Sequence, residues 1–263
     1  MEWIKSTDNP RIKQVIRLKD RKYREQEKLF IIQGMREIEL ALSAGIKIQS
    51  TFFSPLFIEK HPHSSLLNPP HPIQGTSQRV FEKMCHGDYH QGILSVAHTP
   101  HFAFADLKNL EQALLLVLVE IEKPGNLGAL VRSAAAAGAS GVILCEPQTD
   151  PYNPLTIRNS IGTVFSLPLI RTSSQETLSF LRNNRIKILA TSPHASTHYL
   201  DINMKSACAF VLGSEKNGLP VNWLEKADKQ IVIPMHRTAD SLNVAMTATV
   251  LLFEAKRQRM PSK

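Results

Sequence analysis

The chain has 263 residues, of which 43% are hydrophobic and 21% charged, with 12 glycines and 16 prolines. These proportions are ordinary for a folded globular protein and exclude disordered and fibrous classes. The longest apolar run, Ala113 to Val119, is too short to cross a bilayer, and the N-terminus has no apolar signal region. We therefore expect a cytoplasmic protein, and the length favours two domains that each bury a core.

Positive charge is concentrated at the two ends of the chain. The net charge is +8, from 31 Lys and Arg against 23 Asp and Glu. Residues 1–36 carry ten basic and five acidic residues (+5), and residues 256–263 carry four basic and no acidic residues (+4), which leaves −1 for the remainder. A cation-rich surface binds polyanions through counterion release, and nucleic acid is the commonest such partner in a cytosol. From charge alone, a solvated surface explains the pattern equally well.

The first hundred residues alternate helix and strand patterns. Asn9 and Pro10 are typical of a helix start, and the helix that follows is amphipathic and basic. Strands are predicted at 29–32 and 51–53, with a helix between them that ends at Gly45. Residues 60–75 hold four prolines and three histidines, which favours a turn-rich loop. These histidines have no second cluster at ligand spacing, so we expect no metal site.

Three cysteines, Cys85, Cys145 and Cys208, are widely spaced and form no C-x-x-C motif. We expect reduced, buried thiols rather than disulfides or a zinc site.

From residue 114 onward, near-continuous apolar strands are separated by helices. This pattern predicts a parallel sheet that helices cover on both faces. The predicted strands are 114–119, 142–144, 186–190, 207–212 and 230–233, and the predicted helices are 126–137, 175–184, 221–227 and 242–257. Residues 98–110 have little periodicity and are predicted to link the two domains.

Three loops after predicted strands are unusual, and the loops at the carboxyl ends of parallel strands are where ligands bind. In the first, Asn126 is predicted to cap a helix, and helical geometry turns Gly128 and Arg132 away from the core-facing apolar side. A surface arginine and a simple cap are the plainer interpretations of these two residues. The loop lacks G-x-G-x-x-G, which disfavours a nucleotide-dependent oxidoreductase.

The second and third loops also combine polar side chains with turn residues. Glu215 lies between two glycines, in a loop whose backbone can wrap a ligand, although such turns are common. Ser241 is a natural cap for the last helix. Asn243 is a poor interior helix former, which suggests either a local hydrogen bond or a role in a site.

Taken in order, these segments resemble the SpoU (TrmH-like) family of RNA ribose 2′-O-methyltransferases. The matching segments are PGNLGALVRSAAAAGASGVIL, DPYNPLTIRNSIGTVFSLPL, FVLGSEKNGLP and IPMHRTADSLNVAMTATVLLFE, which cover most of residues 114–256. Residues 1–97 resemble the substrate-binding domain that often precedes this one. The resemblance implies an α/β fold: a parallel-sheet methyltransferase domain with a deep trefoil knot (111–263), preceded by a smaller α/β RNA-binding domain (1–97) and a linker (98–110).

The resemblance also implies a cofactor, a partner and a set of site residues. The cofactor is S-adenosylmethionine, the substrate is RNA, most often ribosomal RNA, and the enzyme is a homodimer with its active sites at the interface. The residues implied in catalysis are Asn126, Arg132, Glu215, Ser241 and Asn243; those implied in cofactor binding are Gly213, Ile233, Met235 and Leu242; and those expected to bind RNA are Arg11, Lys13, Arg17 and Arg36.

Arg132 is central to the implied chemistry. A ribose hydroxyl is a poor nucleophile, so the enzyme must align it with the methyl donor and help to remove its proton. A guanidinium has a pKa above about 12 and rarely acts as a base, so we expect Arg132 to stabilise the developing alkoxide and to hold phosphate. Two alternatives remain: a tRNA ribose 2′-O-methyltransferase, and a catalytically idle RNA-binding protein of the same fold.

Overall fold

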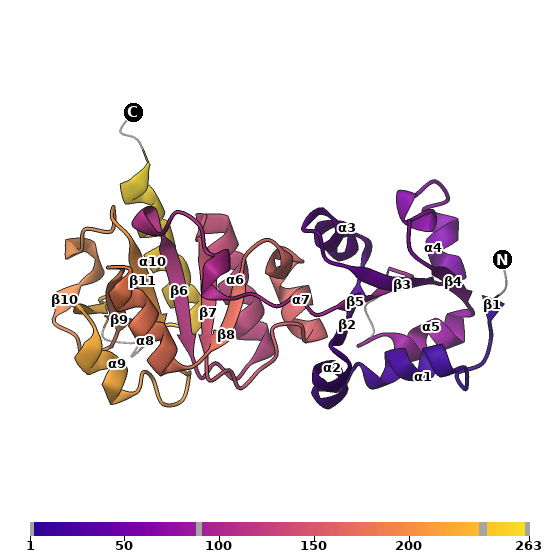
Figure 1. Cartoon of the computed structure of the whole chain (residues 1–263), viewed down its shortest axis with the longest axis horizontal. Coiled ribbons are helices and arrows are strands. Elements are labelled where there is room, and N and C mark those ends of the chain that lie inside the picture. Colours follow the sequence, from indigo (N-terminus) through magenta and orange to yellow (C-terminus); the bar gives the residue numbers. More distant parts are fainter. Residues whose placement is uncertain (1–2, 88–90, 237–240, 261–263) are drawn as a thin grey trace. The chain divides into compact units, whose positions relative to one another are not determined.

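The computed structural model describes residues 3–87, 91–236 and 241–260, and it divides into two compact units (Figure 1). Unit 1 comprises Met1–Pro100 and Tyr152–Ser166, and unit 2 comprises His101–Pro151 and Leu167–Lys263. Within the described residues, no helix is long and apolar enough to cross a membrane.

Unit 1 is built on a mixed sheet with the strand order β1-β4-β3-β5-β2. Its strands are β1 (Trp3–Ile4), β2 (Leu29–Gln33), β3 (Ile48–Phe53), β4 (Ile73–Thr76) and β5 (Ile93–His98). Its helices are α1 (Pro10–Arg17), α2 (Arg21–Glu27), α3 (Met35–Ser43), α4 (Pro55–Lys60), α5 (Gln78–Met84) and α7 (Pro154–Ser160), with short 3-10 turns at Ser65–Leu67 and Thr163–Phe165.

Helix α1 shows how the sequence determines one face of unit 1. Asn9 caps the helix by accepting a hydrogen bond from the backbone N–H of Arg11, and Pro10 occupies the first turn. Ile12 and Val15 are buried in a core shared with α5 and with strands β2, β3 and β5. Helical spacing therefore directs the apolar side of α1 inward and leaves its cationic side in solvent.

A segment from the middle of the chain completes the other face of β2. Successive side chains of a strand point to opposite faces, so Phe30 points away from the core that Leu29 and Ile31 join. The Phe30 ring is fully buried, 4.8 Å from the ring of Tyr152 and 6.0 Å from that of Phe165. The segment 152–166 is therefore part of the hydrophobic packing of unit 1.

Unit 2 contains the sheet that the sequence predicted. Its strands are β6 (Leu114–Val119), β7 (Gly141–Cys145), β8 (Leu169–Thr172), β9 (Lys187–Thr191), β10 (Thr197–His198), β11 (Cys208–Leu212) and β12 (Lys229–Val232). Its helices are α6 (Pro124–Ala137), α8 (Ser174–Asn183), α9 (Val221–Lys226) and α10 (Val244–Arg259), with 3-10 turns at Phe104–Asp106, Leu110–Gln112 and Tyr199–Asp201.

Every pairing in the unit 2 sheet is parallel, and the order is β10-β12-β9-β11-β6-β7-β8 (Figure 1). Helices α8 and α9 pack on β7 and β9, whereas α6 and α10 pack on β6, β7 and β11. The strands are buried along their length, as expected for a sheet covered on both faces. The predicted α/β fold class is confirmed, and the trefoil knot stays a prediction.

The three cysteines are free and buried, as the sequence predicted. Burial raises the pKa of the Cys85 and Cys145 thiols to about 12, because a thiolate is poorly solvated inside the protein. These thiols are therefore protonated and unreactive near neutral pH.

The element boundaries differ from the prediction in a few places. The loop predicted at 60–75 runs into β4, which begins at Ile73, because pairing with β1 and β3 overrides the local proline signal. Within the segment predicted as a linker, the Phe104 ring stacks on Phe180 at 4.1 Å and Leu107 is buried in the core of unit 2. The functional division into 1–97, 98–110 and 111–263 stays a prediction.

Replacing Phe30 with alanine tests the role of segment 152–166 in unit 1. We expect Phe30→Ala to lower the free energy of unfolding by about 3–5 kcal/mol, because it leaves a cavity between two rings. The measurement is urea unfolding followed by circular dichroism. The exposed Leu42→Ala on α3 is the control and should cost less than about 1 kcal/mol. A loss of the same small size for Phe30→Ala would show that these rings contribute little.

Candidate functional site

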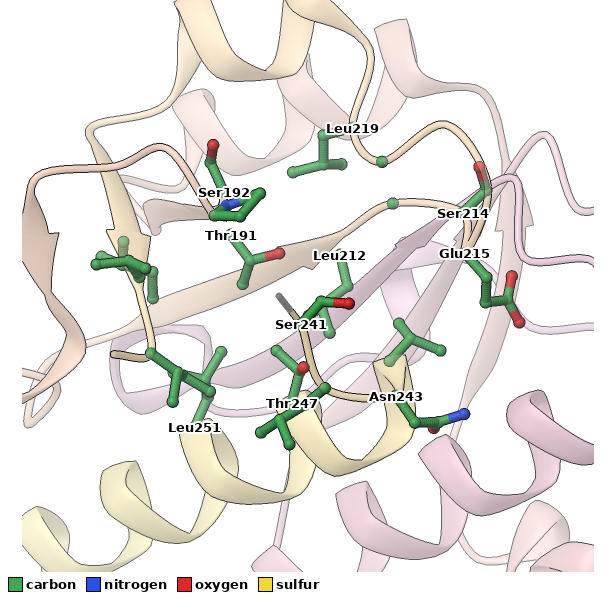
Figure 2. A pocket seen from close by; sticks show the side chains of 18 of the residues that line it. Thr191, Ser192, Leu212, Ser214, Glu215, Leu219, Ser241, Asn243, Thr247 and Leu251 are labelled. Carbon is green, nitrogen blue, oxygen red and sulfur yellow. The ribbon is translucent and has the colours of Figure 1, made fainter. Parts of the chain in front are cut away.

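A cavity of about 600 Å³ lies in unit 2 where β9, β11 and β12 end and α6 and α10 begin (Figure 2). Its size is within the range of small-molecule and cofactor sites. The described residues that line it are Lys123, Asn126, Thr191, Ser192, Pro193, Leu212, Gly213, Ser214, Glu215, Gly218, Leu219, Ile231, Val232, Ile233, Met235, Ser241, Leu242, Asn243, Val244, Thr247 and Leu251. The parallel sheet therefore brings three distant loops to one edge.

The loop after β11 forms one wall of this cavity through a tight turn. The backbone N–H of Gly218 donates to the Ser214 carbonyl at 3.0 Å, and that of Asn217 donates to Ser214 Oγ at 3.1 Å. A Cβ atom on Gly213 would lie 2.0 Å from the Gly218 carbonyl oxygen, so no larger residue fits there without moving the backbone. Gly213 is required for this turn and thereby presents Glu215 at the rim.

A chain of side-chain hydrogen bonds joins the three loops. The amide nitrogen of Asn126 donates to the carboxylate of Glu215, 89 positions away. The amide nitrogen of Asn243 donates to Asn126 Oδ1 at 3.3 Å, across 117 positions. Asn126 thus donates to one loop and accepts from the other, and all three predicted residues share one network.

Asn126 does not cap α6, contrary to the prediction. The helix begins earlier, with Lys123 at the N-cap position and Pro124 in the first turn, because the fixed φ of proline suits a helix start. Asn126 therefore lies inside the first turn, where its side chain is free of the cap and reaches Glu215 and Asn243.

The cap of α10 is Asn243 and not Ser241, which corrects a second prediction. Asn243 Oδ1 accepts from the backbone N–H of Ala245 at 2.9 Å, so α10 begins at Val244. Ser241 instead lines the cavity, with its side chain near the centre of the view (Figure 2). Asn243 uses its oxygen for the cap and its nitrogen for Asn126, which explains an asparagine at this position.

Arg132 is exposed on α6 and is not among the described residues that line the cavity of its own chain. The prediction that Gly128 shares its solvent-facing side is wrong, because Gly128 is buried. Helix α10 packs along α6 and occupies part of the surface that the sequence pattern left open. Helical geometry alone does not reveal that neighbour.

The four residues implied in cofactor binding, Gly213, Ile233, Met235 and Leu242, all line the cavity. The sequence reasoning missed other lining residues, chiefly Thr191, Ser192, Leu219, Thr247 and Leu251. Thr191 and Ser192 could have been found, because they follow a predicted strand of the same parallel sheet. Thr247 and Leu251 lie inside a helix, and only the packing of that helix directs them into the site.

Comparison with known proteins identifies the site. Residues 113–253 match the model of the SpoU rRNA Methylase family, and residues 9–95 match the MRM3-like substrate binding domain. The chain belongs to the SpoU rRNA methylase family. The SpoU match contains all of the predicted catalytic residues and ends within α10.

Three relatives of this SpoU protein extend over nearly its whole length. The 23S rRNA (guanosine(2553)-2′-O)-methyltransferase RlmP of Bacillus subtilis is 26% identical, covering 97% of this chain and all of that protein. A crystal structure of an RNA 2′-O ribose methyltransferase is 40% identical with a TM-score of 0.85, covering 98% and 99% of the two chains. The AdoMet-bound rRNA methyltransferase from Sinorhizobium meliloti is 29% identical with a TM-score of 0.88, covering 99% of both.

These matches confirm the predicted enzyme class, an RNA 2′-O-methyltransferase that uses S-adenosylmethionine. The cavity fits this cofactor by its chemistry. Leu212, Leu219 and Leu242 offer apolar surface, and Thr191 and Ser192 offer hydroxyls. Among the described lining residues, the only ones with a formal charge are Lys123 and Glu215, both at exposed positions, so the interior suits a bulky ligand with few charges. No group of three or more His, Cys, Asp or Glu able to hold a metal occurs among the described residues.

Two substitutions at Asn243 separate its two hydrogen bonds. Asn243→Ala removes both, and we expect it to lower the free energy of unfolding by about 1 kcal/mol and the rate of methyl transfer by about tenfold or more. Asn243→Ser retains a capping oxygen, so stability should stay within about 0.5 kcal/mol of the original while activity still falls. Urea unfolding and a labelled-methyl assay measure the two effects. Full activity in Asn243→Ser would show that capping is the whole role of Asn243.

Proposed function

We propose that this protein methylates a ribose 2′-hydroxyl of 23S ribosomal RNA. The observation that carries the proposal is the network of Asn126, Glu215 and Asn243 at the mouth of the cofactor cavity. Family membership gives the reaction class, and the full-length similarity to RlmP supports the large ribosomal RNA as the substrate. We further propose that the protein acts in the cytoplasm.

The residues around the cavity mouth order the site and position the substrate. Glu215 and Asn243 hold Asn126 from two sides, so the three loops keep one arrangement when RNA arrives. Ser241 lies inside the cavity, beside the bound cofactor. S-adenosylmethionine supplies a methyl group on a positively charged sulfur. Alignment of the attacking oxygen with that methyl group contributes much of the rate enhancement in such a reaction.

Arg132 is assigned to the RNA. Its guanidinium keeps its charge at any physiological pH, so it stabilises negative charge that develops on the ribose oxygen and holds an adjacent phosphate. Because Arg132 does not line the cavity of its own chain, we propose that it serves the active site of the second subunit in a homodimer. This assignment requires the active sites to lie at the subunit interface.

The outer surface of α10 supports such a dimer. Met246, Phe253 and Met260 follow one another at seven-residue intervals, which places them on one side of the helix and its C-terminal end. Their exposed fractions are 61%, 43% and 61%. An apolar stripe of this kind is typical of a protein interface. We propose that a second copy of the chain covers it.

Unit 1 is proposed to bind the RNA outside the target nucleotide. Arg11, Lys13, Arg17 and Arg36 are all exposed, and three of them lie on α1. Lys13 pairs with Asp8 at 3.0 Å, and the Arg17 guanidinium lies 5.8 Å from the ring centre of Tyr23. Exposed pairs of this kind are weak, so phosphate groups can compete for these cations.

Mapping ribose methylations tests the proposed substrate. In a strain that lacks the gene, we expect one 2′-O-methylation of 23S ribosomal RNA to disappear. The unchanged gene should restore that methylation, whereas a gene carrying Arg132→Ala should not, because the guanidinium is needed in the transition state. Both proteins must be shown to accumulate equally. A loss confined to transfer RNA would replace the ribosomal assignment, and no loss in any RNA would favour an idle RNA-binding protein.

The proposed dimer predicts the effect of a charge in the apolar stripe. Phe253→Arg should convert a dimer into a monomer in size-exclusion chromatography with light scattering, because it buries an unpaired cation at the interface. Leu200→Arg is the control, since Leu200 is 59% exposed but lies outside α10; this variant should stay dimeric. A monomeric unmodified protein, or a dimeric Phe253→Arg, contradicts the placement of the interface.

A further inference from the structure

Helices α6 and α10 run side by side from the cavity mouth. Both begin at residues that line it, Lys123 and Asn126 for α6 and Asn243 and Val244 for α10, and they pack together along their lengths. The buried residues of the pair include Ala134 and the alanines 137, 245, 248 and 255. Small side chains let two helices approach closely, but they form shallow ridges that resist sliding poorly.

Three polar contacts cross this alanine-rich seam. Asn243 donates to Asn126 Oδ1 at 3.3 Å at the cavity end. Ser133 Oγ and Thr249 Oγ1 lie 2.7 Å apart in the middle of the seam. Lys256 Nζ donates to the Ala136 carbonyl at 2.9 Å near the C-terminus of α6. These contacts recur at successive turns, so they define one register between the two helices.

The direction of the middle contact follows from the hydroxyl protons. Thr249 Oγ1 also lies 2.7 Å from the carbonyl oxygen of Ala245, to which it donates within α10. A hydroxyl has one proton, so Thr249 accepts from Ser133 in the contact across the seam. Thr249 is half-buried and uses both its donor and an acceptor position. The Ser133–Thr249 bond therefore has a defined geometry and is not a chance meeting of two surface hydroxyls.

Ser133 directly follows Arg132, so the same bond restrains the backbone that carries the guanidinium. The Arg132 side chain is long, and a small rotation or slide of α6 moves its end by more than it moves the backbone. A displacement of about 1 Å from the productive geometry can reduce a rate by about 100-fold. Cofactor-lining groups on α6 lie only at its first turn, where Asn126 is held separately.

We propose that the hydrogen bond from Ser133 to Thr249 is a positioning contact for methyl transfer. It sets the register of α6 on α10, and thereby the direction of Arg132, and neither hydroxyl touches the cofactor or the RNA. The inference rests on the proposed role of Arg132. It assigns to Ser133 and Thr249 a part in the reaction that the residues around the cavity do not supply.

Thr249→Val is the sharpest test, because it removes the hydroxyl and conserves the shape. We expect kcat for methylation of ribosomal RNA from the deletion strain to fall at least about tenfold. The Kd for S-adenosylmethionine, measured by calorimetry, should change less than about twofold, and so should KM for the RNA. Thr249→Ser is the matched control: it keeps the hydroxyl, and kcat should stay within about twofold. Unchanged kcat in Thr249→Val, or a weakened cofactor affinity, overturns the proposal.

A second experiment asks whether Thr249 acts through Arg132. Arg132→Lys keeps the positive charge and should retain a measurable, reduced rate. Adding Thr249→Val to Arg132→Lys should cost much less than the factor that it costs alone, since the group being positioned is already altered. An undiminished additional factor would show that Thr249 acts elsewhere and would overturn the inference. Full activity in Arg132→Lys alone would instead contradict the proposed function of Arg132.

Discussion

The parallel direction of every strand pair in unit 2 is the constraint on which the site depends. It places the carboxyl ends of β9, β11 and β12 along one edge, and the loops that follow them form a single cavity. Hydrogen bonds then join Asn126 to Glu215 and Asn243, residues separated by 89 and 117 positions. No local element could bring these side chains together, so the sheet topology is a precondition of the chemistry.

Helix starts contribute as much to the site as strand ends do. Asn243 ends the loop from β12 and begins α10, and its two amide atoms serve the helix cap and the network separately. Asn126 is available for the network because Pro124 starts α6 two residues earlier. The architecture therefore places two asparagines where their nitrogen and oxygen atoms have different partners. A serine or an aspartate could cap the helix but could not also donate the second bond.

The division of the chain into two units does not follow its division by sequence similarity. The SpoU match runs without interruption from 113 to 253, whereas residues 152–166 belong to unit 1. Their aromatic side chains pack on Phe30 of β2, and α7 contacts the same strand. A boundary between families is set by shared ancestry, but a boundary between cores is set by which apolar surfaces need to be covered. The two criteria agree elsewhere in this chain.

The sequence by itself determined the alternation of strands and helices in unit 2, the buried thiols, the family and the residues of the cavity mouth. These features are local, because apolar periodicity and short motifs encode them. Only the tertiary structure decided that Asn243 caps α10, that α10 covers Gly128, that Thr247 and Leu251 line the cavity, and that segment 152–166 completes unit 1. Each of these depends on a neighbour distant in the chain, and the one-dimensional pattern of a segment contains no information about which neighbour will bury it.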